Sequence, residues 1–341
     1  MKVLKWLLIL IVAGAAALAG IGFFLPDKAH VERSIVIDRP PATVYTVLNG
    51  FRRFNEWSPW ANLDPKAITT YEGPPIGVGS KMSWASEDPN VGSGSQEILE
   101  VEAPSFIKLR LIFADFESDN TATYKLEPEG AGTKLTWSYD TDFRGDLMGR
   151  WFGTMLDSML GPDYEKGLAK LKGLVEMAPA VDLAGFDVQV EDMKPIAIAS
   201  VAGTTTTEPA DIGKSLGEAY AKITAAMTAN GLKQAQAPLA ITRKWAPKEK
   251  VYEYVAGIPV DKADAALPDG DVKMSATPSG LTLKVKHVGP YDQLTATYDK
   301  LMAWEQIAGF KDNGGPWEQY VSDPGSTPAA ELVTLVHLPV K

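Results

Sequence analysis

The chain has 341 residues, 45% of them hydrophobic and 22% charged, a composition typical of a globular protein with about two domains. Its formal net charge of −10 argues against a nucleic-acid partner, because a phosphate-binding surface needs a basic patch and no run of Lys and Arg is present. The absence of cysteine excludes disulfides, thiol catalysis and cysteine metal sites.

The N-terminus carries an uncharged stretch from Trp6 to Leu25. At a helical rise of 1.5 Å per residue, this stretch is long enough to cross a hydrocarbon layer of about 30 Å. Lys2 and Lys5 precede it, and Ala17-Leu18-Ala19 resembles a cleavage site, so a secreted protein with a cleaved signal peptide is the alternative. Because the apolar run continues past that site, we expect an uncleaved, single-pass anchor in the cell membrane, with the bulk of the chain extracytoplasmic.

The next part of the chain alternates between strand and helix patterns. The alternation from Val31 to Ile37 predicts a strand, and Pro40-Pro41 predict the start of a helix. Several strand-like runs separated by turn residues follow between residues 68 and 143. The spacing of apolar residues then predicts a long amphipathic helix over about 149–175, which Gly161-Pro162 should kink or divide.

A strand, a helix, an antiparallel sheet and a terminal helix across it describe a helix-grip fold. The motifs ERSIVIDRPPATVYTVL, FNEWSPW, GVGSKMSW, GSGSQEI and GPDYEKGLAKLK resemble the SRPBCC, or START-like polyketide cyclase/dehydrase, superfamily from about Val31 to Met177. The resemblance implies a cavity for apolar ligands between the long helix and the sheet. It places four tryptophans near that cavity or in the core: Trp57, Trp60, Trp84 and Trp137. Since this scaffold serves binders and enzymes alike, it does not fix a chemistry.

The C-terminal part of the chain contains an internal repeat. Leu216, Tyr220, Gly231 and Pro238 recur, 78 positions later, as Leu294, Tyr298, Gly309 and Pro316 (294−216, 298−220, 309−231, 316−238). Each copy is predicted to form a strand, a helix and two closing strands, and residues 259–280 between the copies are predicted to form a surface loop. Two such units packed together leave a groove at their junction. Ala240 occupies the position in the first copy that Glu318 occupies in the second.

A second resemblance rests on HVGPYDQL, PWEQYVSDP and ELVTLVHLPV. These motifs look like the GyrI-like small-molecule-binding domain, which also occurs as the effector-binding domain of AraC-type regulators. The family's cleft for drug-like, often cationic and aromatic compounds contains a glutamate, and the match implicates Glu318 as ligand-binding, with Trp317 and Tyr320 beside it and Tyr291 as a further candidate. In a strand, Glu318 and Tyr320 share one face while Trp317 lies on the other. Some members are hydrolases.

Metal and cofactor sites are not expected. The three histidines are isolated in sequence, without any paired-His spacing, and no Walker, dinucleotide or GxSxG motif occurs. An ionised Glu318 among aromatic rings would attract cations, whereas a buried Glu318 with a raised pKa could act as a general acid or base. We expect binding, because no second titratable partner or nucleophile is evident beside it.

The sequence therefore predicts an α+β protein with an N-terminal transmembrane helix, a helix-grip domain and a duplicated β-α-β-β GyrI-like domain. Its function is predicted as a membrane-anchored carrier or sensor that binds hydrophobic or amphipathic small molecules, including cationic ones. The alternatives are a hydrolase that uses Glu318 as acid or base, and a structural scaffold at the membrane. The expected divisions are a cytoplasmic stub and anchor at 1–28, the helix-grip domain at 29–177, a linker at 178–186 and the GyrI-like domain at 187–341.

Overall fold

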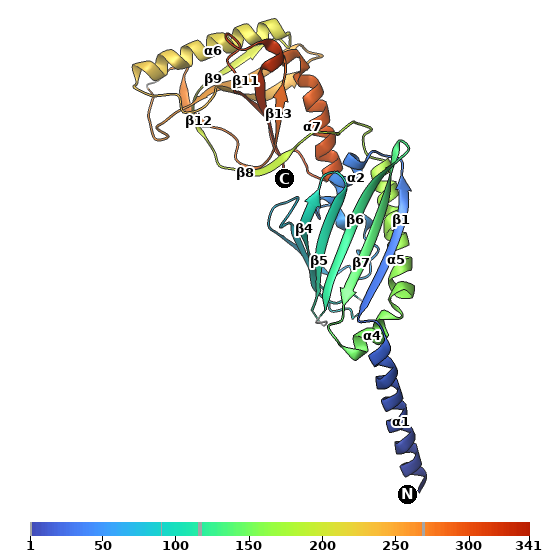
Figure 1. The fold of residues 1–341 in the computed structure, drawn as a ribbon. Coiled ribbons are helices and arrows are strands. Elements are labelled where there is room, and N and C mark those ends of the chain that lie inside the picture. Colours follow the sequence, from blue (N-terminus) through green and yellow to red (C-terminus); the bar gives the residue numbers. More distant parts are fainter. Residues whose placement is uncertain (1, 90, 115–117, 268–269) are drawn as a thin grey trace. The chain divides into compact units, whose positions relative to one another are not determined.

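The computed structural model describes residues 2–89, 91–114, 118–267 and 270–341 (Figure 1). The chain divides into two compact units: unit 1 is residues 1–182 with 307–309, and unit 2 is residues 183–306 with 310–341. Each unit contains one antiparallel sheet with its own helices. The predicted α+β fold class, with an apolar N-terminal helix ahead of two mixed units, is confirmed.

Helix α1 (Lys2–Phe24) opens the chain. Its segment Val3–Phe24 has a mean hydropathy of 2.6 and is 6% buried, so its apolar side chains are almost all exposed. Among the described residues it is the one helix long and apolar enough to cross a membrane, a property that signal sequences share. Gly22 is the buried position, because Trp151 and Leu147 lie against it.

The sheet of unit 1 has the strand order β1-β7-β6-β5-β4-β3-β2, and every neighbouring pair is antiparallel. Its inward-facing side chains alternate along the strands, as in β7, where Leu135, Trp137 and Tyr139 are buried. The strands predicted from the sequence are all present. Their bounds are β1 (Lys28–Ile37), β2 (Ile68–Glu72), β3 (Lys81–Ala85), β4 (Gly94–Glu102), β5 (Phe106–Phe113), β6 (Asp119–Glu129) and β7 (Gly132–Asp142).

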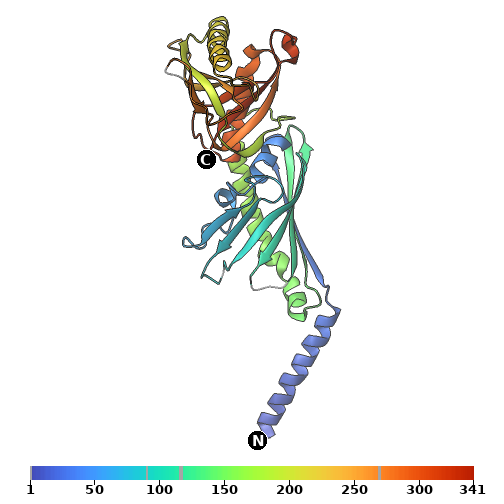
Figure 2. The ribbon, with the colours of Figure 1, turned by 90° about the vertical axis from the view of Figure 1, so that its left-hand side faces the viewer.

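Helices α2 (Pro41–Leu48), α3 (Phe54–Trp57), α4 (Leu147–Gly153) and α5 (Leu156–Glu176) complete unit 1. Helix α5 lies across one face of the sheet (Figures 1 and 2) and buries Tyr164, Leu168, Leu171 and Val175, a helical spacing of three and four residues. This arrangement is the helix grip expected from the sequence.

The long helix is divided, but not where Gly161-Pro162 predicted. The division falls at Thr154 and Met155, whose backbone N–H groups turn back to the carbonyls of Trp151 (3.2 Å) and Phe152 (3.0 Å). These tight turns end α4 before Pro162 is reached, and α5 then runs through Pro162. A division at Gly161-Pro162 was wrong because local hydrogen bonds, which hydrophobic spacing does not reveal, decide where the helix breaks. A kink at Pro162 stays a prediction.

Unit 2 has an eight-stranded sheet in the order β12-β9-β11-β10-β14-β15-β13-β8. Its strands are β8 (Gln189–Met193), β9 (Ala197–Thr205), β10 (Leu239–Ala246), β11 (Val251–Pro259), β12 (Lys273–Ala276), β13 (Gly280–Val288), β14 (Trp317–Tyr320) and β15 (Val333–Pro339). Its helices are α6 (Pro209–Ala229) and α7 (Leu294–Ala308), with short 3-10 turns η1 (Tyr291–Gln293) and η2 (Ala329–Glu331).

The predicted duplication is visible in the sheet order. The copies β9-α6-β10-β11 and β13-α7-β14-β15 meet where β10 pairs with β14, and there Ala240 lies opposite Glu318. The two repeat-related positions are thus direct neighbours. Gly231 and Gly309 follow α6 and α7 with φ of 64° and 82°, a left-handed conformation that favours glycine at the end of a helix.

The segment between the copies differs from its prediction as a surface loop. It contains β12, a four-residue edge strand that pairs with residues 197–200 of β9. The backbone supplies this pairing, so the polar sequence KMSA gives little sign of it. Residues 268 and 269 of the predicted loop lie outside the described part of the chain.

Candidate ligand-binding sites

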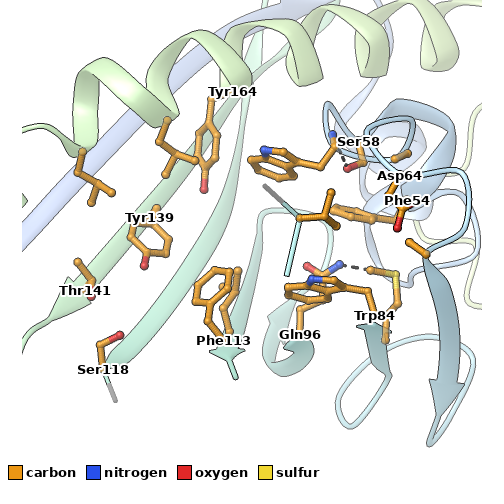
Figure 3. A pocket seen from close by; sticks show the side chains of 18 of the residues that line it. Phe54, Ser58, Asp64, Trp84, Gln96, Phe113, Ser118, Tyr139, Thr141 and Tyr164 are labelled. Carbon is orange, nitrogen blue, oxygen red and sulfur yellow. Dashed lines mark hydrogen bonds between the residues drawn. The ribbon is translucent and has the colours of Figure 1, made fainter. Parts of the chain in front are cut away.

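Unit 1 contains a cavity of about 730 Å³ between its sheet and its helices (Figure 3). Small-molecule sites are typically about 300–1,000 Å³, so this volume suits a ligand of moderate size. Strands β3, β4, β5 and β7, the loops near α3, and helices α4 and α5 provide its walls. The side chains labelled in Figure 3 that line it are Phe54, Ser58, Asp64, Trp84, Gln96, Phe113, Ser118, Tyr139, Thr141 and Tyr164.

Several polar groups of this wall have partners within the protein. The hydroxyls of Tyr139 and Thr141 both donate to Asn120 Oδ1 at 2.7 Å. Burial raises the pKa of Tyr139 to about 12, so its hydroxyl stays neutral. The hydroxyl of Ser86 donates to Asp64 at 2.5 Å and lowers the pKa of that carboxyl, which therefore stays ionised. The rest of the wall is largely apolar, which favours a mainly hydrocarbon ligand.

The four tryptophans lie where the sequence placed them. Trp60 and Trp84 line the cavity. Trp57 and Trp137 are buried behind it, and Trp137 stacks on Tyr164 with ring centroids 3.7 Å apart and an interplanar angle of 12°. Rigid aromatic packing of this kind fixes the shape of the wall.

The second site surrounds Glu318, on β14 near the middle of the sheet of unit 2. The side chain is half-buried and both of its oxygens accept hydrogen bonds. Tyr298 of α7 donates to Oε1 at 3.0 Å, and Tyr320 donates to Oε2 at 2.7 Å. The sequence prediction that Glu318 and Tyr320 share a face of the strand is therefore correct.

Further tyrosines enclose this carboxyl. The ring of Tyr291 meets that of Tyr320 edge-on, with centroids 5.5 Å apart. Burial raises the pKa of Tyr220 on α6 and of Tyr252 on β11, and the nearby charge of Glu318 adds to both shifts. Both copies of the repeat thus supply aromatic rings to one acidic group. Such a group of rings around a carboxylate suits a cation.

Burial also changes the acid itself. Partial loss of contact with water raises the pKa of Glu318, because burial disfavours the charged form. The hydrogen bonds from Tyr320 and Tyr298 act in the opposite direction, but they do not outweigh burial. Glu318 is therefore protonated more readily than an exposed glutamate.

Trp317 lies apart from this cluster. Its side chain is 1% exposed and packs with Ile198, Leu239 and Ile241 on the opposite face of the strand. There it stacks on His337, with centroids 3.6 Å apart and an interplanar angle of 3°. The structure thus brings Glu318, Tyr320 and Tyr291 together and leaves Trp317 out, because successive side chains of a strand point to opposite faces. A ligand contact by Trp317 stays a prediction.

Residues 28–176 match the family model described as polyketide cyclase/dehydrase and lipid transport, and residues 186–341 match the GyrI-like small molecule binding domain. The chain joins an SRPBCC-like domain to a GyrI-like domain. Both are small-molecule-binding types, and the 730 Å³ cavity and the Glu318 cluster belong to the SRPBCC-like and the GyrI-like domain, respectively. A search of curated proteins returned no match.

Solved structures resemble parts of this chain. The EcmrR–DNA complex matches with 18% identity and a TM-score of 0.42, covering 63% of this chain and 88% of that chain. A hydrolase from Listeria innocua matches with 15% identity and a TM-score of 0.36, covering 46% and 92%. The Aha1 dimer from Colwellia psychrerythraea matches with 16% identity and a TM-score of 0.32, covering 44% and 97%. At these identities and scores the matches say nothing about ligand or activity.

Sequence reasoning about the GyrI-like domain missed Tyr298, Tyr220 and Tyr252 as neighbours of Glu318. The internal repeat could have pointed to two of them, because Tyr298 and Tyr220 occupy equivalent positions in its two copies. They behave differently, since the hydroxyl of Tyr220 donates to the carbonyl of Leu239 at 3.0 Å instead of to an acid. Within the described ranges, no group of three or more His, Asp or Glu side chains could hold a metal ion.

Proposed function

We propose that this protein is a membrane-anchored binder of hydrophobic or amphipathic small molecules, acting as a carrier or a sensor. The observation that carries the proposal is the cavity of about 730 Å³ in the SRPBCC-like domain, in a chain that begins with a membrane-length helix. Its aromatic and apolar lining provides room and surface for a hydrocarbon group.

The contacts of α1 favour an anchor over a cleaved signal sequence. The indole Nε1 of Trp151 donates to the carbonyl of Leu18 at 3.3 Å, and Arg150 donates to the carbonyl of Phe23 at 3.0 Å. Cleavage after Ala19 would remove Leu18 and with it the hydrogen bond to Trp151. We infer that α1 is retained, with the two domains on the extracytoplasmic side. The net charge of −10 supports the expectation that nucleic acid is not a partner.

A cavity-filling variant tests the binding proposal in the SRPBCC-like domain. Ala61 lines the cavity, and Ala61→Trp should lower the affinity of the full chain for the apolar dye N-phenyl-1-naphthylamine by about tenfold or more, because the ring occupies the ligand's space. Ala131→Trp, at an exposed turn of the same domain, is the matched control. Equal dye binding by both variants refutes the proposed cavity ligand.

For the GyrI-like domain we propose a cationic, aromatic ligand held by Glu318, with Tyr320 and Tyr291 as ligand contacts. Phenyltrimethylammonium and tert-butylbenzene have nearly the same shape and differ in charge. Glu318→Gln removes the opposite charge and should weaken binding of the cation by about 30-fold, equivalent to about 2 kcal/mol, and leave the neutral compound nearly unchanged. Equal losses for the two compounds contradict the proposal.

The raised pKa of Glu318 supports a second candidate, a hydrolase that uses this group as acid or base. Two tyrosine hydroxyls within 3.0 Å could then orient or polarise a substrate. Turnover of p-nitrophenyl acetate that Glu318→Gln abolishes, while phenyltrimethylammonium still binds, supports the hydrolase. If the parent protein shows no turnover, the hydrolase is refuted and the binder is favoured. If, in addition, neither domain binds its probe, the structural scaffold is favoured.

A further inference from the structure

Apolar side chains are exposed on one corner of unit 1, where α4 meets α5. Met148 is 76% exposed, Met155 52% and Met159 54%, with Phe152 between them at 37%. We call these four residues the α4–α5 corner. Exposed apolar groups gathered in one place mark a surface that is covered by another molecule.

This corner is fixed beside α1. Arg150 binds both the carbonyl of Phe23, at 3.0 Å, and the carboxylate of Asp27, at 3.1 Å. Trp151 packs closely on Gly22, since a Cβ added there would lie 2.8 Å from its Nε1. Figure 1 shows α4 next to the end of α1. The membrane depth of α1 therefore determines the depth of the corner.

That depth follows from helix geometry. If Trp6 to Leu25 span the hydrocarbon layer, Leu18 lies seven residues, or roughly 10 Å, inside its outer boundary. Trp151 donates its hydrogen bond to the carbonyl of Leu18, so its indole would lie inside the hydrocarbon layer and α4 would lie at least as deep as the boundary between headgroups and acyl chains. Arg150, the one charge within α4, enters this region already paired with Asp27.

The same corner forms part of the cavity wall. Met148 and Phe152 line the cavity although they are also exposed, and Leu156 and Leu160 continue the lining along α5. The wall at this end is thus made of side chains that reach from the cavity to the surface. Asp146, the N-cap residue of α4, also lines the cavity here and accepts hydrogen bonds from the backbone N–H groups of Met148 and Gly149.

We propose that the α4–α5 corner is embedded in the headgroup–acyl boundary of the bilayer and that ligands enter the cavity there, directly from the lipid leaflet. The ligand class is then a bilayer-borne amphiphile with a hydrocarbon chain, a fatty acid or a comparable lipid. This inference rests on the proposed anchor and cavity. It explains why the corner is apolar and why the cavity wall includes it.

Because the chain has no cysteine, single cysteines can report depth in the full-length protein. Met148→Cys and Met159→Cys, labelled with bimane in phosphatidylcholine nanodiscs, should be quenched strongly by lipids that carry a doxyl group near the top of the acyl chain. Val36→Cys is the control. It is 43% exposed and lies eight residues along β1 from Lys28, roughly 26 Å from the end of the anchor.

Ala13→Cys, within α1, separates the failure of this inference from that of the anchor. Quenching at Ala13→Cys without quenching at the two corner positions overturns the embedded corner and leaves the anchor intact. No quenching at Ala13→Cys refutes the anchor, and the inference with it. Quenching at all positions except Val36→Cys is the expected result.

Entry from the leaflet has its own test. Met155 and Met159 do not line the cavity, so the double variant Met155→Glu/Met159→Glu should keep the equilibrium binding of 11-(dansylamino)undecanoic acid. The double variant should take up this probe from nanodiscs about tenfold more slowly, because placing charged side chains at the membrane boundary is unfavourable and weakens the contact between the corner and the lipid. Unchanged uptake, matching the control Val36→Glu, overturns the entry route.

Discussion

Glu318→Gln gives a direct test of the buried acid in the GyrI-like domain, through the pH dependence of stability. The folded-state pKa of Glu318 is raised by burial above its unfolded value of about 4.3. Its contribution to stability is therefore fully present below pH 4.3 and is lost as pH rises through the folded pKa. Between the two pKa values the folded state holds one proton that the unfolded state has released.

The size of this effect per pH unit follows from proton linkage. One proton more in the folded state lowers the free energy of unfolding by up to about 1.4 kcal/mol for each unit of rising pH. His337 acts with the opposite sign, since burial lowers its pKa to about 3, and its contribution is present above its unfolded value of about 6.5 and lost as pH falls. The parent protein and the Glu318→Gln variant both contain His337, so its contribution cancels when their free energies of unfolding are subtracted.

The assay is urea unfolding of the full chain in micelles, followed by 19F NMR of 5-fluorotryptophan-labelled protein. Trp245, Trp304 and Trp317 report on the GyrI-like domain. The unfolding free energy of Glu318→Gln minus that of the parent should be constant below about pH 4 and then rise with pH, up to the slope above. A difference that is independent of pH, or that falls as pH rises, refutes the raised pKa.

Three further outcomes follow from the structure. His337→Phe should keep the stacking on Trp317 and reduce the loss of stability between pH 6.5 and 3, and an unchanged acid-side slope in the same urea assay contradicts the lowered pKa. Above the folded-state pKa of Glu318, Tyr320→Phe should lower the free energy of unfolding by about 1.5–3 kcal/mol, because its hydroxyl then donates to a carboxylate, and by less in the Glu318→Gln background; equal costs in a double-mutant cycle argue against a charge-assisted bond. Leu171→Ala should destabilise the SRPBCC-like domain by about 2–5 kcal/mol without moving the GyrI-like transition, and a joint shift of both transitions contradicts independent folding of the domains.

The tyrosines around Glu318 show which residues of a site can be predicted from the sequence and which cannot. Glu318 and Tyr320 lie two residues apart on one strand, so strand geometry alone puts them on one face and removes Trp317 from it. Tyr298 and Tyr252 come from other elements, and their distance from Glu318 depends on how helix and sheet pack. A local sequence pattern therefore does not predict that Tyr298 and Tyr252 lie near Glu318.

The sequence by itself determined the succession of elements in both domains, the duplication and the membrane-length helix, because hydrophobic period, turn residues and repeats are local properties of a chain. Tertiary structure decided the rest. The pairing of β10 with β14 sets Ala240 opposite Glu318, and the packing of Trp151 on Gly22 places the α4–α5 corner beside α1. Burial also decided the direction in which the pKa of Glu318 shifts, since a pKa depends on the groups that replace water around a carboxyl, and those groups come from distant parts of the chain.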